Sequence, residues 1–333
     1  MGNLYQNQLD LHRSPSYTNI LTSKAENVIL RKGDIAITLT GTNNKRDFGY
    51  TYIFNDEKNL LLNQRCGLIR TKGDPYFLSC LLKTYAFLNQ FFESATGGTG
   101  NQANVSTKAM EMFSVNTPSL KEQKKIGELM ALLDERIATQ NKIIEDLKKL
   151  KSAISERLFK SVKGSIVLLS DICDIVKGKQ INGENLSERG RYYVMNGGTE
   201  PSGYYDDYNV EANTISISEG GNSCGYVQFN TFPFWSGGHC YSIQNVTENV
   251  DNLYLYHYLK SNEDNIMKLR IGSGLPNIQK KDLAMFKIIV PTLEQQMTIS
   301  TFLSSIERKA EIERRIQNAI QKQKLYLLQQ MFI

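Results

Sequence analysis

Apolar residues recur at alternating spacings of three and four in two long stretches of the chain. One series runs from Ile126 to Ile154 and the other from Ile299 to Leu327. This spacing is typical of a coiled-coil seam sustained for about five heptads. It predicts two helices of about 40 residues, each about 60 Å long at a rise of 1.5 Å per residue.

The start of each predicted helix carries a capping signal. Ser119 is followed three residues later by Glu122, and Thr292 by Gln295. In such a capping box the two side chains bond to backbone N–H groups that the first helical turn leaves unpaired. A proline directly precedes both boxes and ends the preceding segment.

The two stretches are parts of a long internal repeat. Residues 118–159 align without a gap onto residues 291–332. Upstream the match continues after small shifts, so that Asp74 and Phe77 correspond to Asp251 and Tyr254. A repeat of this length indicates two copies of one unit, each a globular part followed by a helix, rather than a solenoid. Segment 169–186 has no clear counterpart near the amino end, so we expect a shortened first copy.

The polar residues within the predicted seam favour an antiparallel helix pair. In a parallel pair Arg136 would face Lys309, whereas one antiparallel register places Arg136 opposite Glu313 and also pairs the apolar positions. The alternative is two separate helices, each packed on its own globular part. The residues predicted to pair the helices are Leu129, Leu133, Arg136, Gln140, Ile143, Leu147, Phe302, Ile306, Lys309, Glu313, Ile316 and Ile320.

Short runs of β-branched and aromatic residues predict strands in the globular parts. They occupy 28–30, 34–39 and 50–54 in the first part, and 167–169, 192–195, 214–217 and 287–290 in the second. Helices are expected at 75–92 and 252–269. Many short strands with few helices favour an α+β fold. The predicted division is a first domain at 1–117, a first spacer helix at 118–162, a second domain at 163–290 and a second spacer helix at 291–333.

Composition limits the possible function without selecting one. The 333 residues carry a net charge of +5, which permits nucleic-acid binding but does not require it. Five cysteines without a Cys-x-x-Cys pair and three histidines predict no metal site and reduced thiols, hence a cytoplasmic protein. No apolar run is long enough to cross a membrane.

Enzyme motifs are missing from the sequence. It contains no Walker loop and no Gly-x-Gly-x-x-Gly after a strand. The Asn/Asp-Pro-Pro-aromatic motif of amino-methyltransferases is absent as well. We therefore predict no catalytic residue and no cofactor.

Both predicted long helices start with the pattern Pro-Ser/Thr-Leu-x-x-Gln, at residues 118 and 291. Together with the heptads and the duplication, this pattern resembles the specificity subunit of type I restriction–modification systems. Segments 196–204, 215–221, 235–240 and 274–278 are similar to target-recognition domains of that family. The resemblance implies two such domains, each reading one half of a bipartite, asymmetric site in double-stranded DNA. It also implies helices that space the domains and dock two DNA methyltransferase subunits. Two questions stay open: whether restriction (translocase/nuclease) subunits join, and whether the shortened first domain reads a full half-site.

A DNA-reading domain needs cationic side chains that bind phosphates. It also needs amides, Arg or Lys that bind base edges. Glycines beside them allow close backbone approach. The alternative to a DNA-binding role for each loop is an ordinary polar turn. The alternative function for the whole chain is a protein-binding scaffold or a DNA-binding enzyme with an unrecognised active site. The first-domain candidates are Thr42, Asn43, Asn44, Lys45, Arg46, Arg65, Asn101 and Gln102. The second-domain candidates are Lys177, Lys179, Gln180, Asn196, Gly198, Thr199, Tyr204, Asn222, Ser236, His239, Ser273, Asn277 and Lys280.

Overall fold

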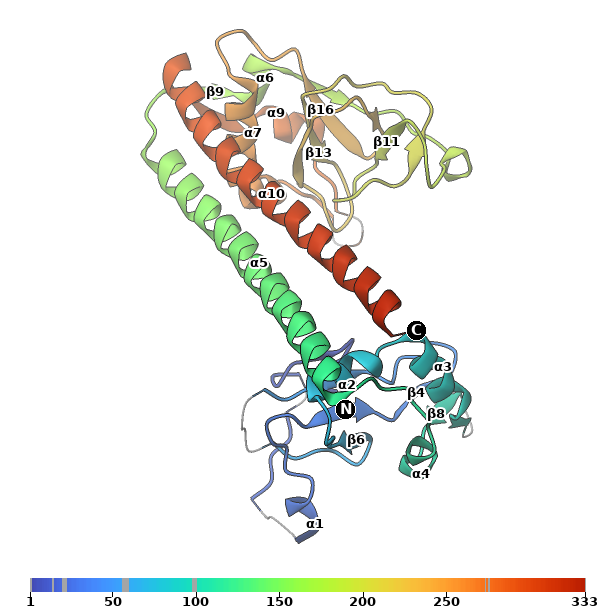
Figure 1. The fold of residues 1–333 in the computed structure, drawn as a ribbon. Coiled ribbons are helices and arrows are strands. Elements are labelled where there is room, and N and C mark those ends of the chain that lie inside the picture. The colour runs from blue at the N-terminus through green and yellow to red at the C-terminus, as the bar shows by residue number, and fades with distance from the viewer. Residues whose placement is uncertain are drawn as a thin grey trace. The chain divides into compact units, whose positions relative to one another are not determined.

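The chain forms two compact units, each built from one globular part and from portions of both long helices. A computed structural model describes residues 2–13, 15–19, 23–55, 60–97, 101–272, 274 and 276–332, without the side chains of residues 23 and 24. One unit comprises Met1–Lys142 and Arg314–Ile333, and the other comprises Ile143–Glu313. The long helices are α5 (Leu120–Ser161) and α10 (Leu293–Met331), so the division between the units crosses both of them (Figure 1).

The globular part of the first unit contains two small antiparallel sheets and a hairpin. One sheet has the order β5-β3-β6 and the other β4-β8-β7, while β1 pairs with β2. The strands are β1 (Leu4–Tyr5), β2 (Gln8–Leu9), β3 (Ile35–Thr38), β4 (Thr40–Thr42), β5 (Thr51–Ile53), β6 (Cys66–Ile69), β7 (Thr96–Gly97) and β8 (Gln102–Asn104). The helices are α1 (Ser23–Glu26), α2 (Pro75–Leu81), α3 (Tyr85–Glu93) and α4 (Thr107–Glu111). The core forms where Ile35 and Ile37 of β3 meet Phe77 and Phe91.

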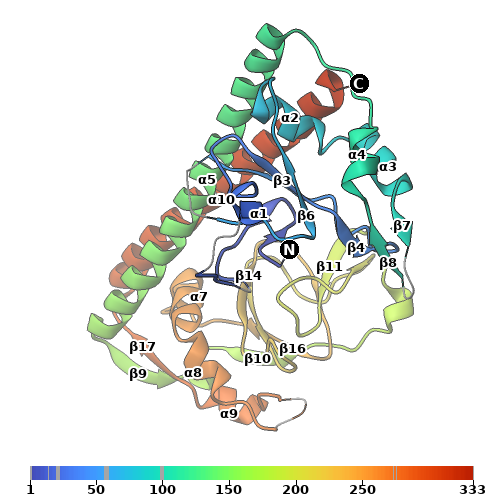
Figure 2. The same ribbon diagram turned by 90° about the horizontal axis from the view of Figure 1, so that it is seen from below.

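The globular part of the second unit is built around a four-stranded antiparallel sheet of order β10-β16-β13-β14. A three-stranded sheet of order β12-β11-β15 and the pair β17-β9, visible in Figure 2, complete it. The strands are β9 (Ser165–Leu168), β10 (Asp174–Lys177), β11 (Tyr192–Met195), β12 (Tyr204–Tyr205), β13 (Thr214–Ser218), β14 (Val227–Asn230), β15 (Trp235–Ser236), β16 (Cys240–Gln244) and β17 (Lys287–Val290). The helices are α6 (Leu169–Ile172), the 3-10 turn η1 (Gly183–Asn185), α7 (Asn252–Ser261), α8 (Glu263–Met267) and α9 (Lys280–Ala284).

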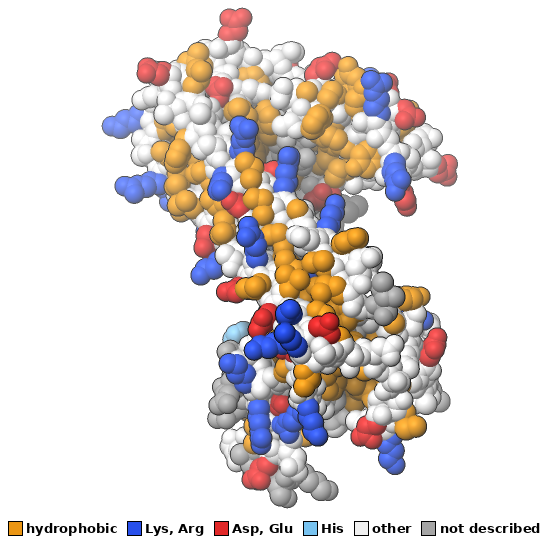
Figure 3. Space-filling model, in the orientation of Figure 1, with side chains coloured by type: hydrophobic (Ala, Val, Ile, Leu, Met, Phe, Trp, Pro, Cys, Tyr) orange, Lys and Arg blue, Asp and Glu red, His pale blue; other side chains and the backbone are white. Residues whose placement is uncertain are grey.

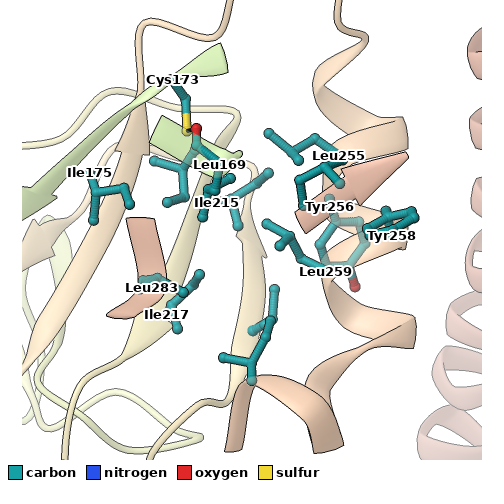
Figure 4. Packing of buried hydrophobic residues seen from close by; sticks show 14 of the residues in the cluster. Leu169, Cys173, Ile175, Ile215, Ile217, Leu255, Tyr256, Tyr258, Leu259 and Leu283 are labelled. Carbon is teal, nitrogen blue, oxygen red and sulfur yellow. Dashed lines mark hydrogen bonds between the residues drawn. The ribbon is translucent and has the colours of Figure 1, made fainter. Parts of the chain in front are cut away.

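Helix α7 covers one face of the second domain's central sheet. Figure 4 shows Leu255 and Leu259 of α7 pointing toward Ile215 and Ile217 of β13. Every residue of β13 is buried, which identifies it as a central strand covered on both faces. This α+β architecture agrees with the predicted fold class.

Each helix predicted inside a globular part is divided into two. The predicted helix 75–92 is interrupted at Thr84, whose hydroxyl accepts a hydrogen bond from the Phe87 N–H and starts α3. The predicted helix 252–269 is interrupted at Asn262, which lies between α7 and α8. Threonine and asparagine favour such cap positions because their side chains bond to nearby backbone groups.

Within each unit, α5 and α10 run antiparallel and contact each other, as predicted. In the first unit Lys324 pairs with Asp134, and the Gln317 and Asn141 side chains are hydrogen-bonded. In the second unit Lys151 pairs with Glu307. The contacts within each unit thus belong to the same antiparallel register.

The detailed register differs from the predicted one. With Asp134 facing residue 324 and Asn141 facing 317, Arg136 would lie opposite residue 322 rather than Glu313. Half of the predicted pairing residues do lie in the buried or half-buried stripes, namely Leu133, Gln140, Leu147, Ile306, Glu313 and Ile320. The other half, namely Leu129, Arg136, Ile143, Phe302, Lys309 and Ile316, are exposed, and Met130, Ile137, Ile144, Leu303, Ala310 and Gln317 take their places.

The phase of the three–four alternation explains why half of the predicted pairing residues are exposed. Two phases of a heptad share every second position and differ by one residue at the others. The neighbours Leu129 and Met130 are both apolar, as are Ile143 and Ile144, so the sequence supports either phase. In the structure Met130 and Ile144 are buried, at 0% and 7% exposure, whereas Leu129 and Ile143 are 40% and 37% exposed.

Each globular part is joined to the helix that follows it by a buried glutamine. Gln123 donates to the Pro118 carbonyl at 2.9 Å and accepts from the Asp74 N–H at 3.3 Å. Gln296, its equivalent in the repeat, donates to the Pro291 carbonyl at 2.9 Å and accepts from the Asp251 N–H at 2.9 Å. Because Asp74 and Asp251 cap α2 and α7, one amide links the proline before the spacer helix, a domain helix and the spacer helix itself.

The far end of the other spacer helix also packs on each globular part. Phe332, the residue after α10, stacks on Phe77 of α2, with ring centroids 5.0 Å apart. Phe159 of α5, its equivalent in the repeat, contacts Tyr254 and Tyr258 of α7 at 5.8 and 5.3 Å. Each domain is therefore held by the start of its own helix and by the end of the other.

Candidate nucleic-acid interface

Several loops of the second domain meet at the ends of β10, β11, β13 and β15. The Lys179 N–H donates to the Ser236 carbonyl at 2.9 Å, and the His239 N–H donates to Asn196 Oδ1 at 3.0 Å. Gly220 forms a backbone bridge with Asn277. The loops 177–180, 196–199, 219–222, 236–239 and 276–278 thus form one group, which we call the second loop cluster.

The carboxylate of Glu219 lies at the centre of this cluster. Its side chain is 9% exposed. Oε1 accepts from Lys177 Nζ at 2.6 Å and from the Tyr241 hydroxyl at 3.0 Å. His239 Nδ1 lies 3.8 Å from Oε2, an oxygen that is buried without a hydrogen-bond partner among the described residues. Burial and the neighbouring carboxylate raise the pKa of Tyr241, so its hydroxyl keeps its proton and can donate it to Glu219 or to the Ile278 carbonyl, which lies at 3.1 Å.

The backbone around Glu219 is held equally firmly. Its N–H donates to the His239 carbonyl at 2.9 Å, and its carbonyl accepts from the Ile278 N–H at 2.8 Å and from the Cys224 thiol at 3.0 Å. Ser218 Oγ donates to the Gly197 carbonyl at 2.6 Å. Glu219 therefore links the loops 177–180, 236–239 and 276–278.

Most second-domain candidates present their side chains to solvent. Those exposed are Lys177, Lys179, Gln180, Thr199, Tyr204, Asn222, His239, Asn277 and Lys280, while Asn196 and Gly198 are half-buried. Tyr204 lies on β12, where it pairs with Tyr193, and Lys280 begins α9. Ser273 lies outside the described residues.

Ser236 is a correction to the predicted site. It is fully buried, and its hydroxyl donates to the Cys240 carbonyl at 3.4 Å. Its backbone is fixed by Asn209, whose Oδ1 accepts from the Ser236 N–H at 2.6 Å. A side chain in this position supports the loop and cannot touch a ligand.

Sequence reasoning missed Glu219, Tyr241 and Asn209 as organising residues. The available signal was a carboxylate placed directly after the strand Thr214–Ser218, in which β-branched residues alternate with serines, because buried charges require partners. The partners come from β10 and β16, which are distant in sequence, so only the folded sheet identifies them.

The first-domain candidates also gather around one turn, the first loop cluster. Thr42 of β4 pairs with Gln102 of β8, and the Asn43 N–H donates to the Asn101 carbonyl at 3.0 Å. The side chains of Asn43, Asn44, Lys45, Arg46, Asn101 and Gln102 are exposed, and Thr42 is half-buried. Arg65 is exposed as well, and its carbonyl accepts from the Leu39 N–H at 2.9 Å, one residue before β4 begins.

Two features stabilise this turn. The Thr42 N–H donates to Asp47 Oδ1 at 2.6 Å. Arg46 adopts a positive φ of 47°. Its guanidinium carbon lies over the Phe92 ring, 5.1 Å from the ring centroid, which is a cation–π contact. The cluster therefore presents amides and cations from a defined turn.

The shifted pKa values of two cysteines and one histidine outside the clusters follow from burial. Burial raises the pKa of Cys173 to about 12 and that of Cys240 to about 11, so neither thiol is a ready nucleophile. Burial lowers the pKa of His257 to about 4, and its Nε2 is hydrogen-bonded to Ser304 Oγ at 2.9 Å. Within the described part of the chain, no three His, Cys, Asp or Glu residues are grouped to hold a metal ion.

Apolar side chains are exposed along the spacer helices, and Figure 3 shows hydrophobic groups gathered there. On α10 a shallow groove is lined by Leu293, Met297 and Phe302, which are 44%, 54% and 49% exposed. On α5 the repeat equivalents of two of them, Leu120 and Leu129, are 65% and 40% exposed. No helix among the described residues is long and apolar enough to span a membrane.

Comparisons with known proteins agree on one family. The family described as "Type I restriction modification DNA specificity domain" matches residues 2–149 and again residues 164–322. The chain is 26% identical to the type I restriction enzyme MjaVIII specificity subunit of Methanocaldococcus jannaschii, over 89% of this chain and 77% of that protein. Its fold is similar to the crystal structure of a type I restriction–modification S subunit from M. genitalium, with a TM-score of 0.68, 19% identity, and coverage of 91% of this chain and 83% of that one.

Proposed function

Because this chain belongs to the type I restriction–modification DNA specificity family, we propose that it is the non-catalytic subunit that reads a bipartite, asymmetric DNA site for a methyltransferase complex. Each globular domain reads one half of the site. The observation that carries the proposal is the duplicated loop cluster, one in each domain, with exposed amides and cations on turns fixed by backbone hydrogen bonds.

The chemistry of the clusters supports DNA as the ligand. Amide side chains such as Asn43 and Gln180 can bond to adenine edges, and Lys or Arg can bond to guanine edges or to phosphates. The second loop cluster combines these groups with glycines that permit close approach of the backbone, as at Gly198. Lys45 and Lys179 are exposed cations that can reach phosphates.

The spacer helices support docking of two methyltransferase subunits. Leu120 and Leu293 are equivalent in the repeat, as are Leu129 and Phe302, and all four are exposed. Exposed apolar groups at equivalent positions suit two copies of one partner. This proposal predicts a complex whose mass fits two methyltransferase subunits per chain, and a mass that fits one would contradict it.

The decisive experiment is to map methylated adenines in DNA from cells that contain this chain and its methyltransferase. A single bipartite motif with an unread gap is the expected result. Methylation without such a motif would overturn the proposal.

A protein-binding scaffold and a DNA-binding enzyme remain the alternatives to test. The complex should shift duplex DNA with an affinity that falls steeply with salt, which a scaffold would not do. Binding of S-adenosylmethionine by the isolated chain would favour an enzyme.

A further inference from the structure

We propose that Lys177, held by the buried carboxylate of Glu219, reads a base edge within the half-site of the second domain, and that the pair determines specificity there. The inference rests on the proposed function and assigns a role within it. The ligand class is a pair of acceptor atoms on a base in duplex DNA, for which the guanine O6 and N7 edge is the common partner of a lysine.

The geometry distinguishes Lys177 from an ordinary surface lysine. Its Nζ lies 2.6 Å from Glu219 Oε1, while its side chain is 53% exposed. A lysine ammonium has three donors, so one bond to Glu219 leaves two for an external acceptor. The contact with Glu219 turns a flexible point charge into a donor with a fixed direction.

Glu219 can hold that direction because it is itself fixed. Tyr241 binds the same oxygen, and the backbone of Glu219 is bonded to His239 and Ile278. A carboxylate that is 9% exposed also keeps its partner from moving, since separating the pair would leave a buried charge uncompensated.

The charge balance argues against a simple phosphate contact. Lys177 and Glu219 together carry no net charge, so the pair adds little to the general attraction for a polyanion. Lys179, two residues later, is exposed, and its backbone is fixed by Ser236 and Trp235. In the part of the chain that the structure describes, no carboxylate forms an ion pair with Lys179, which is the better phosphate contact and the matched control.

The experiment uses the complex of the full chain with its methyltransferase and a set of duplexes. The set contains the mapped site and every single base-pair change in the half read by the second domain. Affinities are measured at several salt concentrations for the wild type, Lys177→Met, Glu219→Gln and Lys179→Met.

Lys177→Met and Glu219→Gln should each lose discrimination at the same one base pair, by about tenfold to a hundredfold. Their salt dependence should stay close to that of the wild type. Lys179→Met should instead weaken binding to all duplexes and lower the salt slope by about one.

A uniform loss of affinity for Lys177→Met, with a lower salt slope and unchanged preference, would overturn the inference in favour of a phosphate contact. Relaxation by Lys177→Met but not by Glu219→Gln would overturn the role of the pair. Thermal unfolding of each variant checks folding, and the double variant Lys177→Met with Glu219→Gln, which leaves no buried charge uncompensated, tests the inference if either single variant unfolds. A wild-type complex without sequence preference would instead refute the proposed function.

Discussion

The ion pair between Lys151 and Glu307 provides a direct test of the helix register. Lys151 is 18% exposed and Glu307 is 37% exposed, and the Tyr256 hydroxyl also donates to Glu307 at 3.0 Å. Lys151→Glu would place two carboxylates against each other in the seam. Breaking a fully buried pair costs about 3–5 kcal/mol and an exposed pair less than about 1 kcal/mol. For this half-buried pair we expect a loss of about 2 kcal/mol.

The loss is measured by urea and thermal unfolding at pH 7. For a unit of this size, about 2 kcal/mol corresponds to a melting temperature lower by about 4–8 °C. The double variant Lys151→Glu with Glu307→Lys restores opposite charges and should recover about half of the loss. Recovery stays incomplete because Tyr256 would then face an ammonium group instead of its acceptor.

Arg136→Glu is the control for the other register. Arg136 is exposed, so its reversal should change stability by less than about 0.5 kcal/mol. The reasoning would be refuted if Arg136→Glu destabilised the protein as much as Lys151→Glu and if Glu313→Lys rescued it, because that result belongs to the register predicted from sequence.

Three further outcomes are expected. Burial lowers the pKa of His257 from 6.5 to about 4, so the unfolded state takes up the proton first. The free energy of unfolding should therefore fall by up to about 3 kcal/mol as the pH drops from 6.5 to 4. His257→Gln should flatten this pH dependence in urea titrations, and an unchanged pH dependence would contradict the prediction. Gln296→Leu leaves the Pro291 carbonyl and the Asp251 N–H unpaired and should lower the free energy of unfolding in urea by about 2–4 kcal/mol. The control Gln321→Leu changes an exposed side chain and should be near neutral. Equal effects of the two substitutions would contradict the described contacts. Exchanging residues 163–290 for the corresponding domain of another family member should change one half of the methylated motif, and changes in both halves would argue against modular reading.

The long helices and their orientation could be predicted from sequence because their determinants are local or repeat along the chain. Capping boxes mark where α5 and α10 begin, and heptad spacing indicates that they pair. The duplication predicted two similar units, and matched contacts of Gln123 and Gln296 occur in them. Polar turns also identified many of the residues in both loop clusters.

Tertiary structure decided what depends on contacts between segments that are distant in sequence. Both heptad phases offer apolar neighbours such as Ile143 and Ile144, and packing selects Ile144 for the seam. Ser236 has the composition of a binding-loop residue but is buried by strand pairing. Glu219 gains its importance only when β10 and β16 bring Lys177 and Tyr241 to it, because a buried carboxylate is stable only where its partners meet.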